Sequence, residues 1–323
     1  MTVATELRVR VAMGRRQGAA ILPPQLLERL AAWATPVESL ADADVVVTGW
    51  GTPLVLDEEA LAAAPRLRAL VHTGGSVRTI VTPAVWERGL TVSSAADVNA
   101  GPVAEFAYAQ IALAAKRALG TAAGYRAGRW PAFGAREGAD GRTVGVVGAS
   151  RIGRRVLSRL HGAEAGYRIL LYDPYVSAVD AKRLGAELAD IHTLCATSSI
   201  VTLHAPELPE TRHLLNAERL ALMPDGATVV NTARGALVDT DALVRECASG
   251  RLDAFLDVTD PEPLPVGHPL LTLPNVFLTP HIAGCQGDEV RRLGAFAVDE
   301  VGRLARGEPL LGAIRREEWA RMA

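Results

Sequence analysis

Strand-length runs of β-branched residues alternate with longer stretches rich in Ala, Leu and Arg along the whole chain. This alternation is typical of parallel sheets, because two parallel strands can be joined only by a long crossover, which is usually a helix. A chain of 323 residues exceeds one ordinary domain and suits two, each able to bury its own core. We therefore predict an α/β protein built from two doubly wound parallel-sheet domains.

The first third of the chain predicts a small α/β domain. It contains three strand-like runs, at 7–13, 42–50 and 66–75, and a helix that begins with two prolines. A weakly charged stretch at 99–119 then predicts one helix of about five turns. The Gly- and Arg-rich stretch that follows, at 124–142, predicts an exposed connector.

The second domain is predicted to contain six strands, the first of which begins at Thr143. These runs are TVGVVG, RILLYD, SIVTLHA, ATVVNTA, LDAFLDV and NVFLTPH. An amphipathic helix follows them at 288–307, and we expect the last residues to fold back onto the first domain. The first domain is thus assigned residues 1–99 and 292–323, and the second domain residues 100–291.

The bulk composition argues against several classes of protein. The 34 Lys and Arg residues balance 36 Asp and Glu residues, so the chain lacks the basic excess of a nucleic-acid-binding protein. No apolar run reaches the roughly 18 to 20 residues of a membrane-spanning helix, and the first residues lack the layout of a signal peptide. Three scattered cysteines fit reduced thiols rather than a disulfide framework or a zinc site. We expect a cytoplasmic protein without nucleic-acid, membrane or metal partners.

The stretch VGVVGASRIG predicts a phosphate-binding turn between a strand and a helix. Gly148 and Gly153 occupy the first and third glycine positions of a G-x-G-x-x-G loop, while Ser150 occupies the second. A serine side chain is small and its hydroxyl can donate to a phosphate, so we expect the loop to keep this function. Asp173 ends the next strand about 20 residues after Gly153, where a carboxylate binds an adenosine ribose and repels a 2′-phosphate. The pattern predicts an NAD site.

Three polar side chains follow different strands of the second domain, namely Arg234, Glu262 and His281. Ligands bind beyond the carboxyl ends of the strands in open parallel sheets, so these side chains are expected at the same edge as the glycine loop. A guanidinium can bind a carboxylate through two hydrogen bonds and polarise a neighbouring carbonyl. A histidine paired with a carboxylate can exchange a proton near neutral pH. Beside a nicotinamide, this set predicts hydride transfer at the carbon next to a carboxylate.

These motifs resemble those of the D-isomer-specific 2-hydroxyacid dehydrogenases over essentially the whole chain. The resemblance is carried by VGVVGASRIG, NTARGALVD, LDVTDPEPLP and LTPHIAG, and by NAGPVAEFA upstream. It implies two Rossmann-like domains, a flavodoxin-like substrate domain and an NAD-binding domain. It also implies a homodimer formed through the NAD-binding domain, and a small 2-oxo or 2-hydroxy acid as substrate.

The resemblance implies a role for each matching residue. Arg234 would bind the substrate carboxylate and carbonyl, His281 would be the general acid and base, and Glu262 would be the partner of His281. The cofactor would be bound in the glycine loop and at the strand ends by Gly148, Ser150, Arg151, Ile152, Gly153, Asp173, His204, Pro206, Thr232, Asp257 and Gly284. In the first domain, the backbone N–H groups of Gly74, Gly75 and Ser76 would bind the substrate carboxylate.

Departures from the family pattern leave the substrate open. Ser76 stands where a glycine is common, and Arg78 stands where an acidic residue is common. Arg78 is either a solvated surface residue or a contact for a second acidic group on the substrate. Reduction of glyoxylate or hydroxypyruvate is the first expectation, and oxidation of 3-phosphoglycerate is the second.

Two other functions are compatible with parts of this pattern. A formate-oxidising relative is disfavoured, because that chemistry replaces the glutamate partner with an amide, whereas Glu262 is a carboxylate. The alternative from a different class is a cofactor-sensing binding module, like the C-terminal binding protein corepressors.

Overall fold

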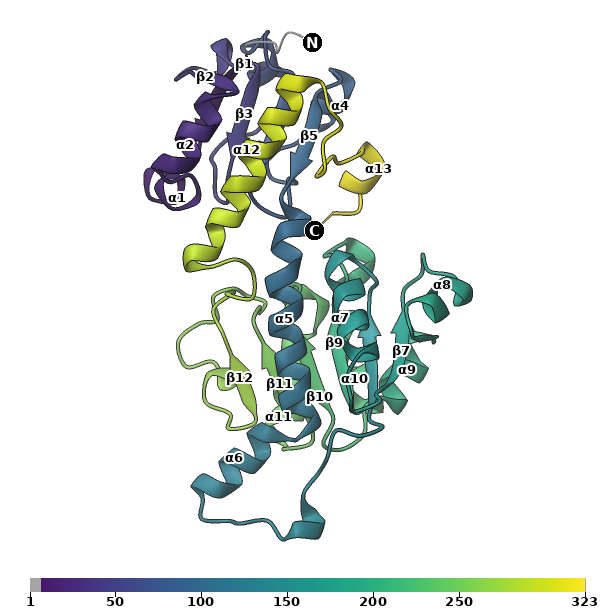
Figure 1. Ribbon diagram of the computed structural model, residues 1–323. Helices are drawn as coiled ribbons and strands as arrows, with labels where there is room; N and C mark the ends of the chain where they lie inside the picture. Colours follow the sequence, from purple (N-terminus) through teal and green to yellow (C-terminus); the bar gives the residue numbers. More distant parts are fainter. Residues whose placement is uncertain (1–6, 323) are drawn as a thin grey trace. The chain divides into compact units, whose positions relative to one another are not determined.

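Two sheets organise the computed structural model, which describes residues 7–322 (Figure 1). All pairs of named strands in the described residues are parallel. The chain divides into two units, one made of the residues up to 100 and from 285 on, the other of residues 101–284. Each unit has its own sheet and helices, so the predicted fold class is confirmed. The outer ends of the expected first domain, residues 1–6 and 323, lie outside the described residues.

The first unit contains a five-stranded sheet made of Leu7–Ala12 (β1), Ala34–Pro36 (β2), Val45–Thr48 (β3), Ala69–His72 (β4) and Thr91–Ser94 (β5). The strand order is β2-β1-β3-β4-β5, which is the order of flavodoxin-like folds. β1, β3 and β4 lie within the three predicted runs. β2 and β5 are additional strands. β2 has only three residues and β5 is rich in Thr and Ser, so neither forms the apolar run that predicts a strand.

The first unit has helices on both faces of its sheet, namely Arg15–Ile21 (α1), Pro24–Ala31 (α2), Glu58–Ala62 (α3), Pro83–Glu87 (α4) and Val290–Arg306 (α12). Val45 and Val47 point to the face that α1, α2 and α12 cover. Val46 points to the opposite face, together with residues of α3 and α4. Alternate residues of a strand point to opposite faces, so one run of valines supplies both cores.

The second unit contains a seven-stranded sheet made of Thr143–Val147 (β6), Arg168–Tyr172 (β7), Glu187–Leu188 (β8), Ile200–Leu203 (β9), Thr228–Asn231 (β10), Asp253–Leu256 (β11) and Val276–Leu278 (β12). The spatial order is β12-β11-β10-β9-β6-β7-β8, the doubly wound order that reverses between β6 and β9. All strands except β8 match the predicted runs. β8 is a two-residue edge strand with exposed side chains, so it lacks the apolar pattern that identifies a strand in a sequence.

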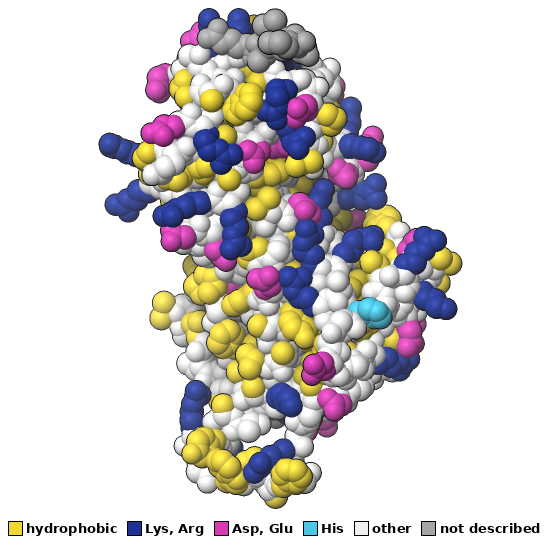
Figure 2. All heavy atoms as spheres, viewed as in Figure 1, with side chains coloured by type: hydrophobic (Ala, Val, Ile, Leu, Met, Phe, Trp, Pro, Cys, Tyr) yellow, Lys and Arg dark blue, Asp and Glu magenta, His cyan; other side chains and the backbone are white. Residues whose placement is uncertain are grey.

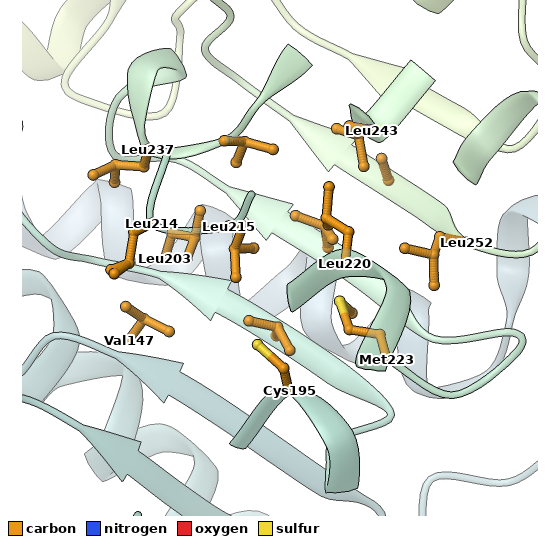
Figure 3. Close-up of a cluster of buried hydrophobic side chains, with 14 of the residues drawn as sticks. Val147, Cys195, Leu203, Leu214, Leu215, Leu220, Met223, Leu237, Leu243 and Leu252 are labelled. Carbon is orange, nitrogen blue, oxygen red and sulfur yellow. The ribbon is translucent and has the colours of Figure 1, made fainter. Parts of the chain in front are cut away.

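Helices also cover both faces of the second sheet, namely Ala96–Ala115 (α5), Arg151–His161 (α7), Ala178–Arg183 (α8), Ile191–Thr197 (α9), Ala217–Leu222 (α10) and Thr240–Ala248 (α11). Buried side chains of α9, α10 and α11 pack on one face with Val147 and Leu203 (Figure 3). Side chains of α5 and α7 pack on the other face with Val146 and Phe255. Because both faces are covered, the central strands of this unit are mostly apolar.

The predicted helix at 99–119 is two helices, α5 and α6 (Ala118–Arg126), and α6 includes the first residues of the expected connector. Arg117 separates them with a left-handed backbone (φ 49°), which costs an L-residue roughly 1–2 kcal/mol. Its guanidinium lies 3.5 Å from Glu137 and 3.9 Å from Asp253. Both partners are distant in sequence, so the local pattern could not predict this break. None of the helices in residues 7–322 has the length and apolarity to cross a bilayer.

The second boundary between the units differs from the predicted one. It falls after Gly284, whereas the sequence placed it after residue 291. The backbone N–H of Cys285 donates to Asn99 Oδ1 (2.8 Å), and Cys285 packs in a small apolar cluster with Leu293. The segment that precedes α12 therefore packs with the first unit.

Candidate active site

A row of residues follows the strand ends of the second unit. The parallel register aligns the last residues of six neighbouring strands, so the residues that come next emerge side by side at one edge of the sheet. We call this set the strand-end row, and in spatial order it contains Asp173, Gly148, His204, Thr232, Asp257 and Thr279. All of these except Thr279 are predicted cofactor residues. A single cause, the register, therefore brings them together.

The two glycines of the predicted phosphate loop allow close backbone contacts. Gly148 has a positive φ of 95°, and a Cβ atom on it would lie 2.9 Å from the carbonyl of His204. A Cβ atom on Gly153 would lie 2.0 Å from the carbonyl oxygen of Gly148. Only glycine meets both requirements, so the N-terminus of α7 can approach the end of β6. A helix N-terminus in this position is a site for a phosphate group.

Ser150 replaces the usual second glycine without backbone strain. It is the N-cap of α7, with an extended backbone (φ −62°, ψ −180°), and its Oγ accepts from the N–H of Gly153 at 3.3 Å. Any L-residue adopts this conformation, and serine is among the preferred N-caps. The hydroxyl hydrogen is not used in this bond and can donate to an anion. Arg151 and Ile152 form the first turn of α7, with Arg151 exposed.

Asp173 lies directly beside the glycine loop. Its Oδ2 accepts from the N–H of Ala149 (2.8 Å), and its Oδ1 accepts from the N–H of Tyr175 (2.8 Å). These bonds fix the orientation of the carboxylate, which still has lone pairs for the two hydroxyls of a ribose. The glycine turn, the helix N-terminus and this carboxylate together fit the adenosine and pyrophosphate portions of a dinucleotide.

His204 lies beneath the glycine loop and is buried. Its Nε2 is 3.0 Å from Thr202 Oγ1, and burial lowers the pKa of the imidazole to about 3, so the ring is neutral at physiological pH. Its Nδ1 and the Oγ1 of Thr232 are buried without a hydrogen-bond partner among the described residues. Pro206, the other predicted residue of this segment, is half-buried, and its carbonyl accepts from Thr211 Oγ1. His204 therefore packs against the glycine loop at Gly148–Gly153.

Glu262 and His281 form the predicted pair. His281 Nδ1 lies 2.7 Å from Glu262 Oε1, and the two side chains are 50% and 43% exposed. His281 has a left-handed backbone (φ 54°), and its N–H donates to the carbonyl of Asp257 at 2.8 Å. The second ring nitrogen, Nε2, is not used in the pair. An imidazole held in this way can transfer a proton through Nε2 while the carboxylate stabilises its charged form.

Asp257 has a task that sequence reasoning missed. Its buried carboxylate accepts from the hydroxyl of Thr279 (2.6 Å) and from the backbone N–H groups of Ile282 (2.8 Å) and Ala283 (2.9 Å). The carboxylate thus holds the loop that carries His281 in its left-handed conformation. Gly284 follows this loop as the last residue of the unit.

Arg234 lies next to the loop that carries Glu262. A Cβ atom on Gly235 would lie 2.0 Å from the carbonyl of Thr259, so the turn after β10 touches the loop after β11. The N–H of Thr259 in turn donates to Glu262 Oε2 (3.4 Å). Arg234 itself is half-buried and donates from Nη1 to the carbonyl of Ala233 (2.7 Å). The second unit therefore brings all three predicted catalytic residues to the ends of β10, β11 and β12.

The predicted carboxylate loop, Gly74 to Ser76, belongs to the first unit and follows β4. A Cβ atom on Gly74 would lie 2.5 Å from His72 Nε2 and 2.6 Å from Trp50 Nε1, so any larger residue here would displace these side chains. Within residues 7–322, the backbone N–H groups of Gly74 and Gly75 have no hydrogen-bond partner. His72 is buried with its Nδ1 2.9 Å from Thr48 Oγ1, and burial lowers its pKa to about 4. Sequence reasoning gave no role to His72 or Trp50, although His72 ends β4 and Trp50 follows β3.

Comparisons with known proteins agree on one family. A family model described as the D-isomer specific 2-hydroxyacid dehydrogenase NAD binding domain matches residues 108–283. The chain is 34% identical to a glyoxylate reductase of Korarchaeum cryptofilum over 84% of this chain and 82% of that one. It is 36% identical to a D-3-phosphoglycerate dehydrogenase of Methanocaldococcus jannaschii over 84% of this chain and 52% of that one. The chain spans about half the length of the curated phosphoglycerate dehydrogenases that it matches.

A solved structure supports the same grouping. It is the structure of a D-isomer specific 2-hydroxyacid dehydrogenase from Xanthobacter autotrophicus in complex with NADPH and MES. The TM-score is 0.77 at 25% sequence identity, and the match covers 98% of this chain and all of the other. The likeness thus extends over both units.

The two buried histidines predict an acid-sensitive fold. Burial lowers the pKa of His204 to about 3 and that of His72 to about 4, whereas an unfolded histidine titrates near 6.5. The free energy of unfolding is therefore highest above about pH 6.5. It decreases as the pH falls toward 4, by about 1.4 kcal/mol per pH unit for each histidine, because only the unfolded state binds the proton. Urea denaturation between pH 7 and 5 measures this slope. The substitution His204→Gln should reduce it, and equal slopes in the two proteins would contradict the assignment.

A second prediction concerns Asp257. In the substitution Asp257→Asn the amide nitrogen cannot accept a hydrogen bond, so one of the N–H groups now held by the carboxylate loses its partner. We expect the free energy of unfolding to fall by about 1–3 kcal/mol. Urea denaturation measures this value. Asp239→Asn is the matched control, because Asp239 caps α11 and asparagine caps a helix equally well. Equal losses of unfolding free energy in the two variants would show that the Asp257 carboxylate does not stabilise the loop.

Proposed function

Because the chain belongs to the D-isomer specific 2-hydroxyacid dehydrogenase family, we propose that it is an NAD-dependent enzyme that interconverts small 2-oxo acids and D-2-hydroxy acids. One observation carries the proposal: the hydrogen bond between Glu262 and His281 lies at the same sheet edge as Arg234 and the glycine loop. A proton donor, a carboxylate-binding cation and a dinucleotide turn at one edge are the parts that this reaction needs.

NAD is the proposed cofactor. When bound, it supplies the hydride that reduces C2 of the oxo acid, or accepts that hydride in the opposite direction. Asp173 supports NAD over NADP, because its carboxylate, oriented by Ala149 and Tyr175, would repel a 2′-phosphate. Gly148, Gly153 and the first turn of α7 would hold the pyrophosphate, and Thr232 and His204 would line the site next to it.

The chain's own residues carry the remaining chemistry. The guanidinium of Arg234 would bind the substrate carboxylate and polarise the C2 carbonyl. Nε2 of His281 would donate a proton to the carbonyl oxygen during reduction and remove it from the hydroxyl during oxidation. Glu262 would stabilise the imidazolium form through its bond to Nδ1, while Asp257 holds the backbone of His281.

A small monocarboxylic substrate such as glyoxylate or hydroxypyruvate is the preferred proposal. The loop Gly74 to Ser76 would contribute backbone N–H groups to the substrate carboxylate. Arg78 follows this loop, but its guanidinium bonds to Ala320 and lies over Trp319. This engagement favours a substrate without a second acidic group over 3-phosphoglycerate, although relatives named for either activity are similar to the chain.

A cofactor-sensing binding module is the second candidate function. Such a protein would keep the dinucleotide turn but would not need a proton-transfer pair. The bond between Glu262 and His281 therefore favours the enzyme, and turnover distinguishes the two.

We also propose a homodimer. Tyr125, Trp130 and Phe133 are 63%, 71% and 87% exposed on α6 and the connector, where Figure 2 shows hydrophobic side chains gathered at the lower end of the view. Of the three, Trp130 lines a groove of about 650 Å³, and Arg136 lies 5.5 Å from the centre of the Trp130 ring. Exposed aromatic residues next to an arginine are characteristic of protein interfaces.

We propose a cytoplasmic location on separate grounds. Cys195, Cys247 and Cys285 are free thiols, and all three are buried. Free thiols in place of disulfides support a reducing compartment.

Turnover tests the proposed reaction. NADH oxidation is followed with glyoxylate, hydroxypyruvate, pyruvate and 3-phosphohydroxypyruvate, and we expect the first two to give the highest kcat/KM. His281→Ala should lower kcat by about 10²- to 10⁴-fold, because the general acid is lost. Glu262→Gln should lower it by about tenfold or more, because an amide stabilises the imidazolium less well. His192→Ala, at an exposed histidine of α9, is the control. Full activity of His281→Ala, or no turnover of any oxo acid by the unaltered protein, would exclude the proposal.

Sedimentation velocity tests the homodimer. The unaltered chain should sediment as twice its mass of 34.1 kDa, and Trp130→Glu with Phe133→Glu should give monomers, because the charges cannot be buried in an apolar interface. Leu27→Glu, at an exposed apolar residue of α2, should remain dimeric. A dimer that survives both aromatic substitutions would place the interface elsewhere.

A further inference from the structure

The C-terminal segment of the chain returns to the first sheet. α12 ends at Arg306, and Gly307 reverses the chain with a positive φ of 68°. The following residues run antiparallel beside β5: Gly312 accepts from the N–H of Ser94 (3.0 Å), and the N–H of Ile314 donates to Val92 (2.9 Å). The segment thus covers the open edge of β5.

A buried carboxylate anchors this return. Glu300 on α12 is fully buried, and it accepts from the backbone N–H groups of Leu311 (2.9 Å) and Gly312 (3.1 Å) and from the hydroxyl of Ser93. A Cβ atom on Gly312 would lie 2.3 Å from the carbonyl oxygen of Ser94, so the approach also requires glycine. The course of the chain up to Ile314 is therefore firmly set by hydrogen bonds.

Beyond this anchor, the short helix Arg316–Trp319 (α13) reaches the segment that follows β4. The ring of Trp319 lies 6.0 Å from that of Trp86 on α4. The guanidinium of Arg78 lies 5.9 Å from the centre of the Trp319 ring, and its Nη1 donates to the carbonyl of Ala320 (3.2 Å). Trp319 and Met322 pack against the apolar cluster that contains Val77. The C-terminal segment therefore contacts the residues that directly follow the loop Gly74–Ser76.

The loop contains residues that are costly to order. Gly74 and Gly75 are adjacent glycines, which lose more backbone entropy on ordering than other residues. Val77 is fully buried, and the N–H of Arg78 donates to Ser76 Oγ at 3.4 Å. A displacement of Arg78 would therefore also displace Ser76, which precedes it by two residues. Arg78 stands where the resemblance leads one to expect an acidic residue, and an acidic side chain could neither stack on Trp319 nor donate to Ala320.

We propose that the C-terminal segment Leu311–Met322 holds the loop Gly74–Ser76 in its anion-binding conformation, with Arg78 as the positioning residue. The inference rests on the proposed function for the identity of the anion, which is the carboxylate of a 2-oxo acid. Arg78 does not touch the substrate. It ties the loop to a part of the chain that is itself anchored by Glu300, and so it sets the affinity for substrate rather than the rate of the chemical step.

Amide hydrogen exchange tests the restraint without relying on activity. In the chain of 323 residues, Arg78→Met should speed exchange at the hydrogen-bonded amides of residues 73–81, such as those of Thr73 and Ile80, by about fivefold or more, because the cation–π contact and the hydrogen bond are both lost. Arg78→Lys keeps the positive charge above Trp319 and should restore most of the protection. Arg29→Met is the matched control, since Arg29 pairs with Asp299 of α12, and it should leave exchange at residues 73–81 unchanged. Unchanged exchange in Arg78→Met would overturn the proposal.

Kinetics test the consequence for the site. Arg78→Met should raise KM for the preferred 2-oxo acid by about fivefold while kcat changes by less than about twofold, and Arg78→Lys should restore KM. The Kd for NADH, measured by fluorescence, should stay the same, because the cofactor residues belong to the second unit. Faster exchange with an unchanged KM would overturn the link to substrate binding. If the unaltered protein reduces no 2-oxo acid, the proposed function fails, and the exchange experiment alone decides whether the C-terminal segment restrains the loop.

Discussion

The in-register pairing of parallel strands is the interaction on which the rest of the second unit depends. The ladder that joins β7, β6, β9, β10, β11 and β12 aligns their last residues, from Tyr172 at one side to Leu278 at the other. A shift by one residue in any pair would turn that strand's side chains to the other face and remove its end from the row. The apolar cores on both faces oppose such a shift, so core packing also keeps the strand-end row aligned.

The loops beyond this row are held by a few short contacts. Gly153 against Gly148 places the N-terminus of α7, and Gly235 against Thr259 joins the loops that carry Arg234 and Glu262. The Asp257 carboxylate accepts hydrogen bonds from the backbone that follows His281. The exposed pair of Glu262 and His281 is therefore supported by buried groups, which is how a solvent-accessible proton-transfer pair keeps a fixed geometry.

In the first unit, the loop Gly74–Ser76 is held in a different way. The second unit holds its loops by contacts between neighbouring strand ends, whereas the loop after β4 is followed by Arg78, which bonds to the far end of the chain. Glu300 makes this possible, because it fixes the return of the C-terminal segment beside β5. The C-terminal residues thus act as part of the loop's scaffold, and a departure at a single position, Arg78, has its partner more than 240 residues away.

Local pattern determined much of this protein. The alternation of runs predicts both sheets, the spacing of Gly148, Gly153 and Asp173 predicts the dinucleotide turn, and the positions of Arg234, Glu262 and His281 after three strands predict that they share an edge. The two sheets and the shared edge could be predicted because strand ends and helix starts are set by residues close together in sequence. Contacts between distant residues decided the rest, including the break at Arg117, the boundary at Gly284, the support that Asp257 gives to His281, and the tie from Arg78 to Trp319. A sequence carries no local sign of such contacts, because their free energy arises only when folding brings the partners together and removes them from water.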